Sequence, residues 1–185
     1  IERQYRNTPT IDYAGLPPEL SSANPPTGIA ARDKDYFFDG STGAYLRYNA
    51  DGELVEGILY PTMRRGGGKL YAIDISPSAL TPGVPPQMPA AKWASQFEGI
   101  SQMWSTPMTG FVESEGKQRP LIIFGGGWDG CLDSDINAAL SNCASGKGVY
   151  IADAKTGELL ARFATNAPVV ADVAPIDFDS DGFWD

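Results

Sequence analysis

Short, strand-like apolar runs recur along most of this chain, and glycine, proline or aspartate separates one run from the next. Such runs are typical of β-strands joined by turns. Apolar residues at helical spacing are rare and suggest a helix only over residues 135–140. The frequent glycines (21) and prolines (15) also favour many short elements over long helices. The pattern therefore predicts an all-β fold.

The predicted strands fall into two similar groups of four. The stretch GGGKLYAIDIS (66–76) has a counterpart in GKGVYIADAKTG (146–157), and in each group two strand-like runs precede this stretch and one follows it. The eight predicted strands are 37–48, 56–63, 66–76, 92–97, 104–112, 120–127, 146–157 and 158–163. Units of four short antiparallel strands in tandem are the signature of a β-propeller, and a meander or sandwich is the alternative.

The repeat divides the chain into a lead-in and a partial propeller. Residues 1–34 are rich in proline and predict an extended segment. Blade-like units are expected over 35–100 and 101–164, and residues 165–185 would begin a third unit. Propellers typically need about four to eight blades, so the ring is incomplete and its first expected partner is the remainder of the same propeller or polypeptide. Because the chain begins with Ile1, we expect a fragment or a processed product.

Charge and composition exclude several classes of function. The chain carries 14 Lys and Arg against 23 Asp and Glu, a formal net charge of −9. Nucleic acid and anionic lipid would repel so acidic a protein. Histidine is absent, which excludes Ser-His-Asp triads, Cys-His nucleophiles and histidine zinc sites. No apolar run approaches the roughly 20 residues of a membrane span, so neither a nucleic-acid partner nor a membrane span is expected.

The strongest chemical motif is DFDSDGFWD, at residues 177–185. Its order D-x-D-x-D-G-x-x-D matches a calcium loop, in which positions 1, 3 and 5 offer side-chain oxygens, glycine permits a sharp turn and the next residue offers its carbonyl. Four carboxylates this close would repel one another without a cation. The predicted Ca²⁺ ligands are the side chains of Asp177, Asp179, Asp181 and Asp185 and the carbonyl of Phe183. An Asp-Gly hairpin turn with incidental acids is the alternative.

The two cysteines, Cys131 and Cys143, enclose a polar segment and are too far apart for a C-x-x-C zinc knuckle. In an oxidising compartment they predict a disulfide that clamps this loop. Two unrelated buried thiols are the alternative.

Three weaker motifs are better explained by structure than by ligand binding. Asp133, Asp135 and Asn137 share the alternate spacing of a calcium loop but lack the glycine, so a solvated loop is the preferred interpretation. The segment MRRGGGKL (63–70) holds the only basic cluster but does not match the phosphate-binding loop pattern. The segment ADAKTGELL (152–160) is interpreted as a hairpin turn between two strands.

The order of motifs over residues 36–185 resembles the C-terminal propeller of PilY-type proteins, the tip-associated adhesins and assembly factors of type IV pili. It runs from WSTP through FGGG and YIADAKTG to the aspartate loop. The resemblance implies a non-catalytic, exported protein of the periplasm, outer membrane or cell surface at the pilus tip. In that family the loop binds Ca²⁺, and its occupancy is linked to pilus extension and retraction and to cell adhesion. Implied partners are the minor pilins of the pilus tip and a host or surface receptor.

Two other classes of function remain open. Asp-x-x-Thr-Gly hairpins also mark the blades of PQQ-dependent quinoprotein dehydrogenases. Those enzymes hold calcium through scattered residues and often join adjacent cysteines, whereas this chain has a continuous loop and distant cysteines. A structural propeller of another exported surface protein is the second alternative.

Overall fold

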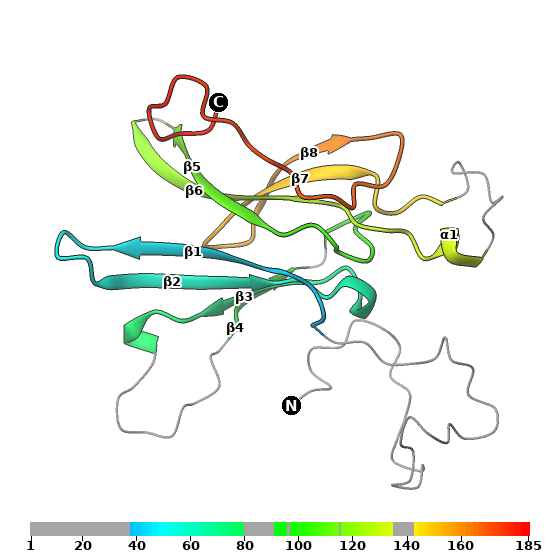
Figure 1. The fold of residues 1–185 in the computed structure, drawn as a ribbon, viewed down its shortest axis with the longest axis horizontal. Helices are drawn as coiled ribbons and strands as arrows, with labels where there is room; N and C mark the ends of the chain where they lie inside the picture. Colours follow the sequence, from blue (N-terminus) through cyan, green and yellow to red (C-terminus); the bar gives the residue numbers. More distant parts are fainter. Residues whose placement is uncertain (1–37, 80–90, 96, 115, 135–142) are drawn as a thin grey trace, which may run out of the picture.

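A computed structural model describes residues 38–79, 91–95, 97–114, 116–134 and 143–185. In this part of the chain the backbone forms two antiparallel sheets of four strands each (Figure 1), and neither sheet closes on itself. The all-β fold predicted from the short apolar runs and the scarcity of helical patterning is confirmed.

In both sheets each strand pairs with the next strand along the chain, although the connections between β3 and β4 and between β6 and β7 are long. The first sheet contains β1 (Thr42–Tyr48), β2 (Leu54–Pro61), β3 (Leu70–Asp74) and β4 (Ala91–Ser95). The second contains β5 (Met108–Ser114), β6 (Lys117–Gly125), β7 (Gly148–Asp153) and β8 (Leu159–Ala164). The short helical turns are η4 (Arg64–Gly66), η5 (Pro77–Ala79) and α1 (Cys131–Ser134).

The two sheets lie within the two predicted four-strand units, 35–100 and 101–164. The predicted lead-in over 1–34 and the weak helical pattern over 135–140 lie outside the described residues. The turn between β1 and β2 illustrates how local chemistry sets the strand ends. There the side chain of Asn49 accepts hydrogen bonds from two backbone N–H groups of the turn, at 3.0 and 2.9 Å.

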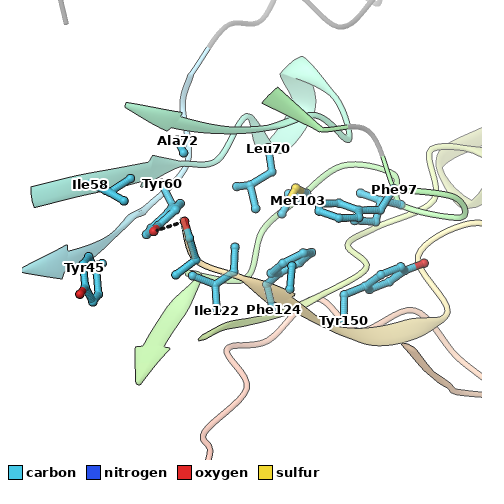
Figure 2. Packing of buried hydrophobic residues seen from close by; sticks show 13 residues of the cluster. Tyr45, Ile58, Tyr60, Leu70, Ala72, Phe97, Met103, Ile122, Phe124 and Tyr150 are labelled. Atoms are coloured by element: carbon cyan, nitrogen blue, oxygen red, sulfur yellow. Dashed lines mark hydrogen bonds between the residues drawn. The ribbon is translucent and has the colours of Figure 1, made fainter. Parts of the chain in front are cut away.

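The core lies where the two sheets face each other (Figure 2). Side chains from β1, β2 and β3 meet those from β6 and β7 and from the segment that links the sheets. The cluster comprises Tyr45, Ile58, Tyr60, Leu70, Ala72, Phe97, Ile100, Met103, Ile122, Phe124, Tyr150, Ala152 and Ala154. The rings of Phe124 and Tyr150 are stacked, with centroids 5.8 Å apart. Burial of this cluster, which contains both aromatic and aliphatic side chains, stabilises the packing of one sheet on the other.

The turn between β7 and β8 docks the second sheet onto the first. The carbonyl of Ala154 in this turn accepts two hydrogen bonds from the first sheet, from the Tyr60 hydroxyl at 2.7 Å and from Trp93 Nε1 at 3.1 Å. Gly157 lies so close to the Trp93 ring that a Cβ at this glycine would come within 2.7 Å of it. Within the turn, one Asp153 oxygen accepts the N–H groups of Lys155 and Thr156. The predicted hairpin therefore also connects the two sheets.

A charge cluster around Glu56 spans the same interface. The Glu56 carboxylate lies 2.8 Å from Nζ of Lys155, 3.3 Å from Nε of Arg47 and 3.8 Å from Nζ of Lys92. Burial alone would raise the pKa of Glu56, but the hydrogen bonds from Lys155 and Arg47 and the nearby charges outweigh it and hold the pKa below its usual value. Lys155 belongs to the second sheet's turn, so this ion pair joins the sheets.

Acid is expected to weaken the contact between the sheets. Because the pKa of Glu56 is lower in the folded than in the unfolded chain, its stabilisation is complete above the unfolded value of about 4.3 and is lost as the pH falls through the folded value. Glu56→Gln should lower the free energy of unfolding at pH 7 by about 1 kcal/mol and flatten its pH dependence below pH about 5. Urea unfolding between pH 3 and 7 measures both effects, with Glu53→Gln on the exposed β1–β2 turn as control. Equal pH slopes for Glu56→Gln and the unaltered chain would contradict this assignment.

Residues 165–185, where a third unit was predicted to begin, contain no strand. The segment instead crosses the side of the second sheet that faces away from the first (Figure 1). The carbonyl of Val169 accepts the N–H of Gly127 at 3.0 Å, and the N–H of Trp184 donates to the carbonyl of Phe111 at 2.8 Å. The segment thus contacts β5, an edge strand of the second sheet, without itself forming a strand.

Candidate metal centre

The aspartate loop brings three of its four carboxylates together. Carboxylate oxygens of Asp177, Asp179 and Asp185 all lie within 4.8 Å of one another. Asp179 and Asp185 are exposed and Asp177 is half-buried, so a cation can reach the group from solvent. Clustered carboxylate oxygens are the hard ligands that Ca²⁺ prefers.

Asp177 organises the turn of the loop. Its two carboxylate oxygens accept the backbone N–H groups of Asp181 at 3.1 Å and Gly182 at 2.9 Å. Asp179 accepts the same Asp181 N–H at 3.2 Å. These bonds turn the two carboxylates towards the inside of the loop, and each oxygen retains a lone pair for a further ligand. The positive φ angles of Ser180 (63°) and Gly182 (93°) produce the sharp turn that this arrangement requires.

The ends of the loop are held together by Asp185. Its N–H donates to the carbonyl of Ile176 at 3.1 Å, and its carboxylate accepts the N–H of Phe178 at 2.6 Å. Asp185 therefore lies beside Asp177 although the two are at opposite ends of the motif. The loop is closed without any residue outside 176–185.

Asp181 lies outside the three-carboxylate group, although the sequence predicts it as a ligand. Its carboxylate accepts the N–H of Phe183 at 2.9 Å, which stabilises the turn after Gly182. The predicted role of the Phe183 carbonyl stays a prediction. The structure thus assembles Asp177, Asp179 and Asp185 and gives Asp181 a different contact.

Trp184 anchors the loop on β5. Its indole ring covers Gly110, and a Cβ at this glycine would overlap ring atoms of Trp184. The Trp184 N–H bond to the Phe111 carbonyl adds a backbone contact beside it. Phe178, by contrast, is 87% exposed. The loop therefore rests on the second sheet through its last turn, next to Asp185.

Gly110→Val is expected to expel the Trp184 ring from β5, because the valine side chain would occupy the place of the indole. The tryptophan emission should shift to longer wavelength, and acrylamide should quench it more strongly. Trp184→Phe and the double variant isolate the contribution of Trp184 from those of the other tryptophans. If Gly110→Val changes acrylamide quenching as much in the Trp184→Phe variant as it does in the unaltered chain, Trp184 is not the residue displaced.

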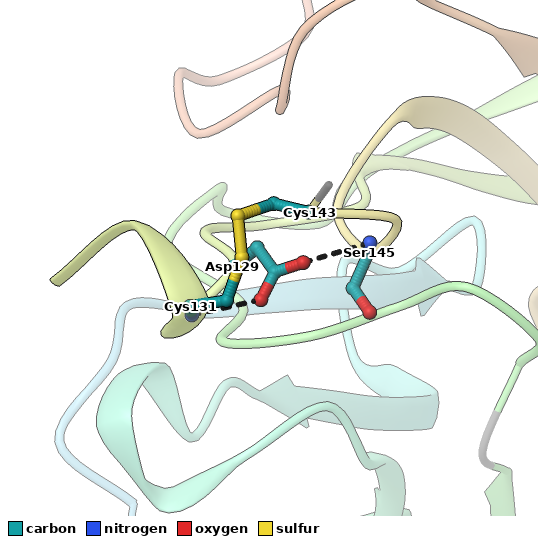
Figure 3. Close-up of a disulfide and its surroundings, with 4 residues drawn as sticks. All are labelled: Asp129, Cys131, Cys143 and Ser145. Carbon is teal, nitrogen blue, oxygen red and sulfur yellow. Dashed lines mark hydrogen bonds between the residues drawn. A yellow bond between two sulfur atoms is a disulfide. The ribbon is translucent and has the colours of Figure 1, made fainter. Parts of the chain in front are cut away.

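The cysteine loop is closed by two separate links (Figure 3). Cys131 and Cys143, the pair that the sequence singles out, form a disulfide with Cα atoms 5.9 Å apart. Asp129 bridges the same two ends, because its carboxylate accepts the N–H of Cys131 at 3.0 Å and that of Ser145 at 2.9 Å. The sulfur atoms and Asp129 lie close together, but bonded sulfurs are not thiolates and hold no metal. This site is structural.

The remaining predicted motifs supply no further metal ligands in the described part of the chain. Asp135 and Asn137 lie outside the described residues, as does the side chain of Asp133. The glycines that follow Arg64 and Arg65 form a tight connection between β2 and β3.

Sequence reasoning alone missed Trp184 and Gly110. The one available signal was a glycine inside a strand, which often marks the close approach of another group. Among the described residues, no helix has the length and apolar character needed to cross a membrane. Comparisons of the chain with family models, curated proteins and solved structures find no match.

Proposed function

We propose that this chain is a non-catalytic, calcium-binding part of a β-propeller in which the two sheets are neighbouring blades. Two features of the fold support this arrangement. The sheets pack face to face, and their first strands, β1 and β5, lie in contact, with the Thr109 hydroxyl donating to the Ala44 carbonyl at 2.6 Å. Blades of a propeller meet in this way around a central axis.

The observation that carries the calcium proposal is the convergence of Asp177, Asp179 and Asp185 on one turn. In the free protein these negative charges repel one another, and a divalent cation removes that repulsion. Binding of Ca²⁺ to the folded loop alone would stabilise the fold by mass action. Calcium would thereby rigidify residues 176–185 against β5, where Trp184 is anchored.

The resemblance of the motif order to PilY-type proteins supports a more specific role. On this proposal the protein is exported, acts at the tip of type IV pili in pilus biogenesis and cell adhesion, and contacts minor pilins and a surface receptor. Calcium occupancy would then set whether the loop presents an ordered surface to those partners. The disulfide between Cys131 and Cys143 fits an oxidising compartment.

Calorimetric titration with Ca²⁺ tests the site. We expect saturable binding of about one Ca²⁺ per chain, little response to Mg²⁺ because that ion demands a small octahedral cage, and a rise in thermal midpoint that a chelator reverses. Asp179→Ala should weaken calcium binding by about tenfold, since affinity depends on the number of charged ligands. Unchanged calcium binding in Asp179→Ala would rule the site out.

Two further measurements distinguish the pilus function from the quinoprotein alternative. Titration with PQQ should give no stoichiometric uptake and no dye reduction, and uptake with dye reduction would overturn the non-catalytic assignment. Asp179→Ala introduced into the full-length protein in its native cells should alter surface piliation. If cells carrying Asp179→Ala show normal piliation and adhesion, calcium binding has no role in pilus function. That result would not affect the proposal that the loop binds calcium.

A further inference from the structure

The basic pair Arg64–Arg65 lies on η4, the turn that follows β2. This turn is fixed to the segment before β5, because the Arg64 N–H donates to the Met103 carbonyl at 3.0 Å and the Met103 N–H donates to the Gly67 carbonyl at 3.4 Å. Arg64 has a φ angle of 43°, a backbone conformation that is strained for a residue with a side chain. The two segments together hold both arginines beside Trp104.

Both guanidinium groups lie near the Trp104 ring. The distance from Cζ to the ring centroid is 5.1 Å for Arg64 and 6.0 Å for Arg65. A cation–π contact uses the flat face of the guanidinium, whereas its N–H groups point outwards in the plane. The contact with Trp104 therefore positions Arg64 without consuming its hydrogen-bond donors.

Three donors in this region are buried and have no hydrogen-bond acceptor among the described residues. They are Nε of Arg64, Nε1 of Trp104 and the hydroxyl of Ser105, a residue that is completely buried. Buried polar groups in proteins are almost always paired, so each such group calls for a ligand or an ordered water. All three can donate, and two of them can only donate. For Arg64 and Trp104 a missing partner must therefore be an acceptor, whereas the Ser105 hydroxyl can also accept.

Three other arginines in the described part of the chain do have acceptors. Arg47 donates to Glu56 and Arg119 to Asp153 and Glu158, while Arg162 donates to a backbone carbonyl and also covers the ring of Tyr150. Arg64 is half-exposed and pairs with no carboxylate in that part of the chain, although its Nε is buried. Unlike these three arginines, Arg64 therefore has donors that an external acceptor could pair with.

We propose that Arg64 and Trp104 form a binding site for a small oxyanion, a carboxylate or phosphate group, with Arg65 at its entrance. The guanidinium supplies the charge and the in-plane N–H of Arg64, and the Trp104 indole supplies a second N–H. This site is independent of the proposed calcium loop: the turn after β2 and the aspartate loop lie at opposite ends of the molecule in Figure 1.

Titration of the whole chain with inorganic phosphate and, separately, with citrate tests the proposal, using tryptophan fluorescence and calorimetry at fixed ionic strength. We expect saturable binding of at least one of these anions at millimolar concentration or below. The anion that binds more tightly shows whether the site prefers a phosphate or a carboxylate group. Arg64→Gln should weaken that binding at least tenfold. Trp104→Phe keeps the ring beside the arginines but removes the indole N–H, and should weaken binding severalfold.

Arg162→Gln is the matched control, because Arg162 also lies over an aromatic ring, and this variant should bind the anion as the unaltered chain does. Circular dichroism and thermal unfolding establish whether each variant is folded. If Arg64→Gln does not fold, the binding measured for Trp104→Phe tests the proposal in its place. Absence of saturable binding of both anions would overturn the proposal and assign water to the buried donors. Equal losses in Arg64→Gln and Arg162→Gln would also overturn it.

Discussion

Trp93→Ala is expected to lower the free energy of unfolding by about 3 kcal/mol, near the lower end of the range for removal of a large aromatic side chain. The indole is partly exposed, which limits the loss from burial, but it makes two contacts with the second sheet that alanine cannot make. Its Nε1 donates to the Ala154 carbonyl, and its ring lies against Gly157. Urea unfolding of the unaltered chain and the variant measures the difference.

A second substitution shows whether the loss arises at this contact. Gly157→Val should also be destabilising, because a Cβ there would press on the Trp93 ring and Gly157 has a φ angle of 72°. If the two residues act through one contact, the double variant should lose less stability than the sum of the single losses. Trp93→Phe, which keeps a ring without the N–H, should cost about 1 kcal/mol. Strictly additive losses would show that the turn does not dock through Trp93.

The strands were predictable from sequence because the information that specifies them is local. Apolar runs of strand length bounded by glycine, as in PLIIFGGG before the cysteine loop, indicate strands without reference to distant residues. Asn49 and Asp153 likewise fix their turns through bonds to residues two to four positions away. The order of four strands in each sheet then follows the general tendency of consecutive strands to be neighbours.

The docking contacts were not predictable, because they join residues far apart in the chain. Nothing in the spacing of Gly110 and Trp184 says that one covers the other, or that Ala154 accepts bonds from both Tyr60 and Trp93. The motif also could not separate the roles of the four aspartates. A pattern of alternate acids places all of them on one loop, whereas the direction of each carboxylate depends on which backbone N–H it accepts.

Asp177→Asn is expected to weaken calcium binding by about a hundredfold, more than any other single change in the loop, since affinity depends on ligand charge. Asp177 contributes a negative charge to the three-carboxylate group and also holds the turn through Asp181 and Gly182. Asparagine keeps the size of the side chain but removes the charge and one acceptor oxygen. Calorimetric titration of the folded variant gives the change in affinity directly.

Asp181→Asn separates the arrangement in the structure from the one the sequence pattern predicts. With Asp181 outside the group, and its carboxylate accepting the Phe183 N–H, this variant should change affinity by less than about threefold, because asparagine keeps an acceptor oxygen for that bond. Asp51→Asn, on the exposed β1–β2 turn, controls for the loss of one negative charge elsewhere. If Asp181→Asn matches Asp177→Asn, the ion draws all four aspartates together and the three-carboxylate arrangement is wrong. If neither variant differs from Asp51→Asn, the ion binds elsewhere and the loop is a turn with incidental acids.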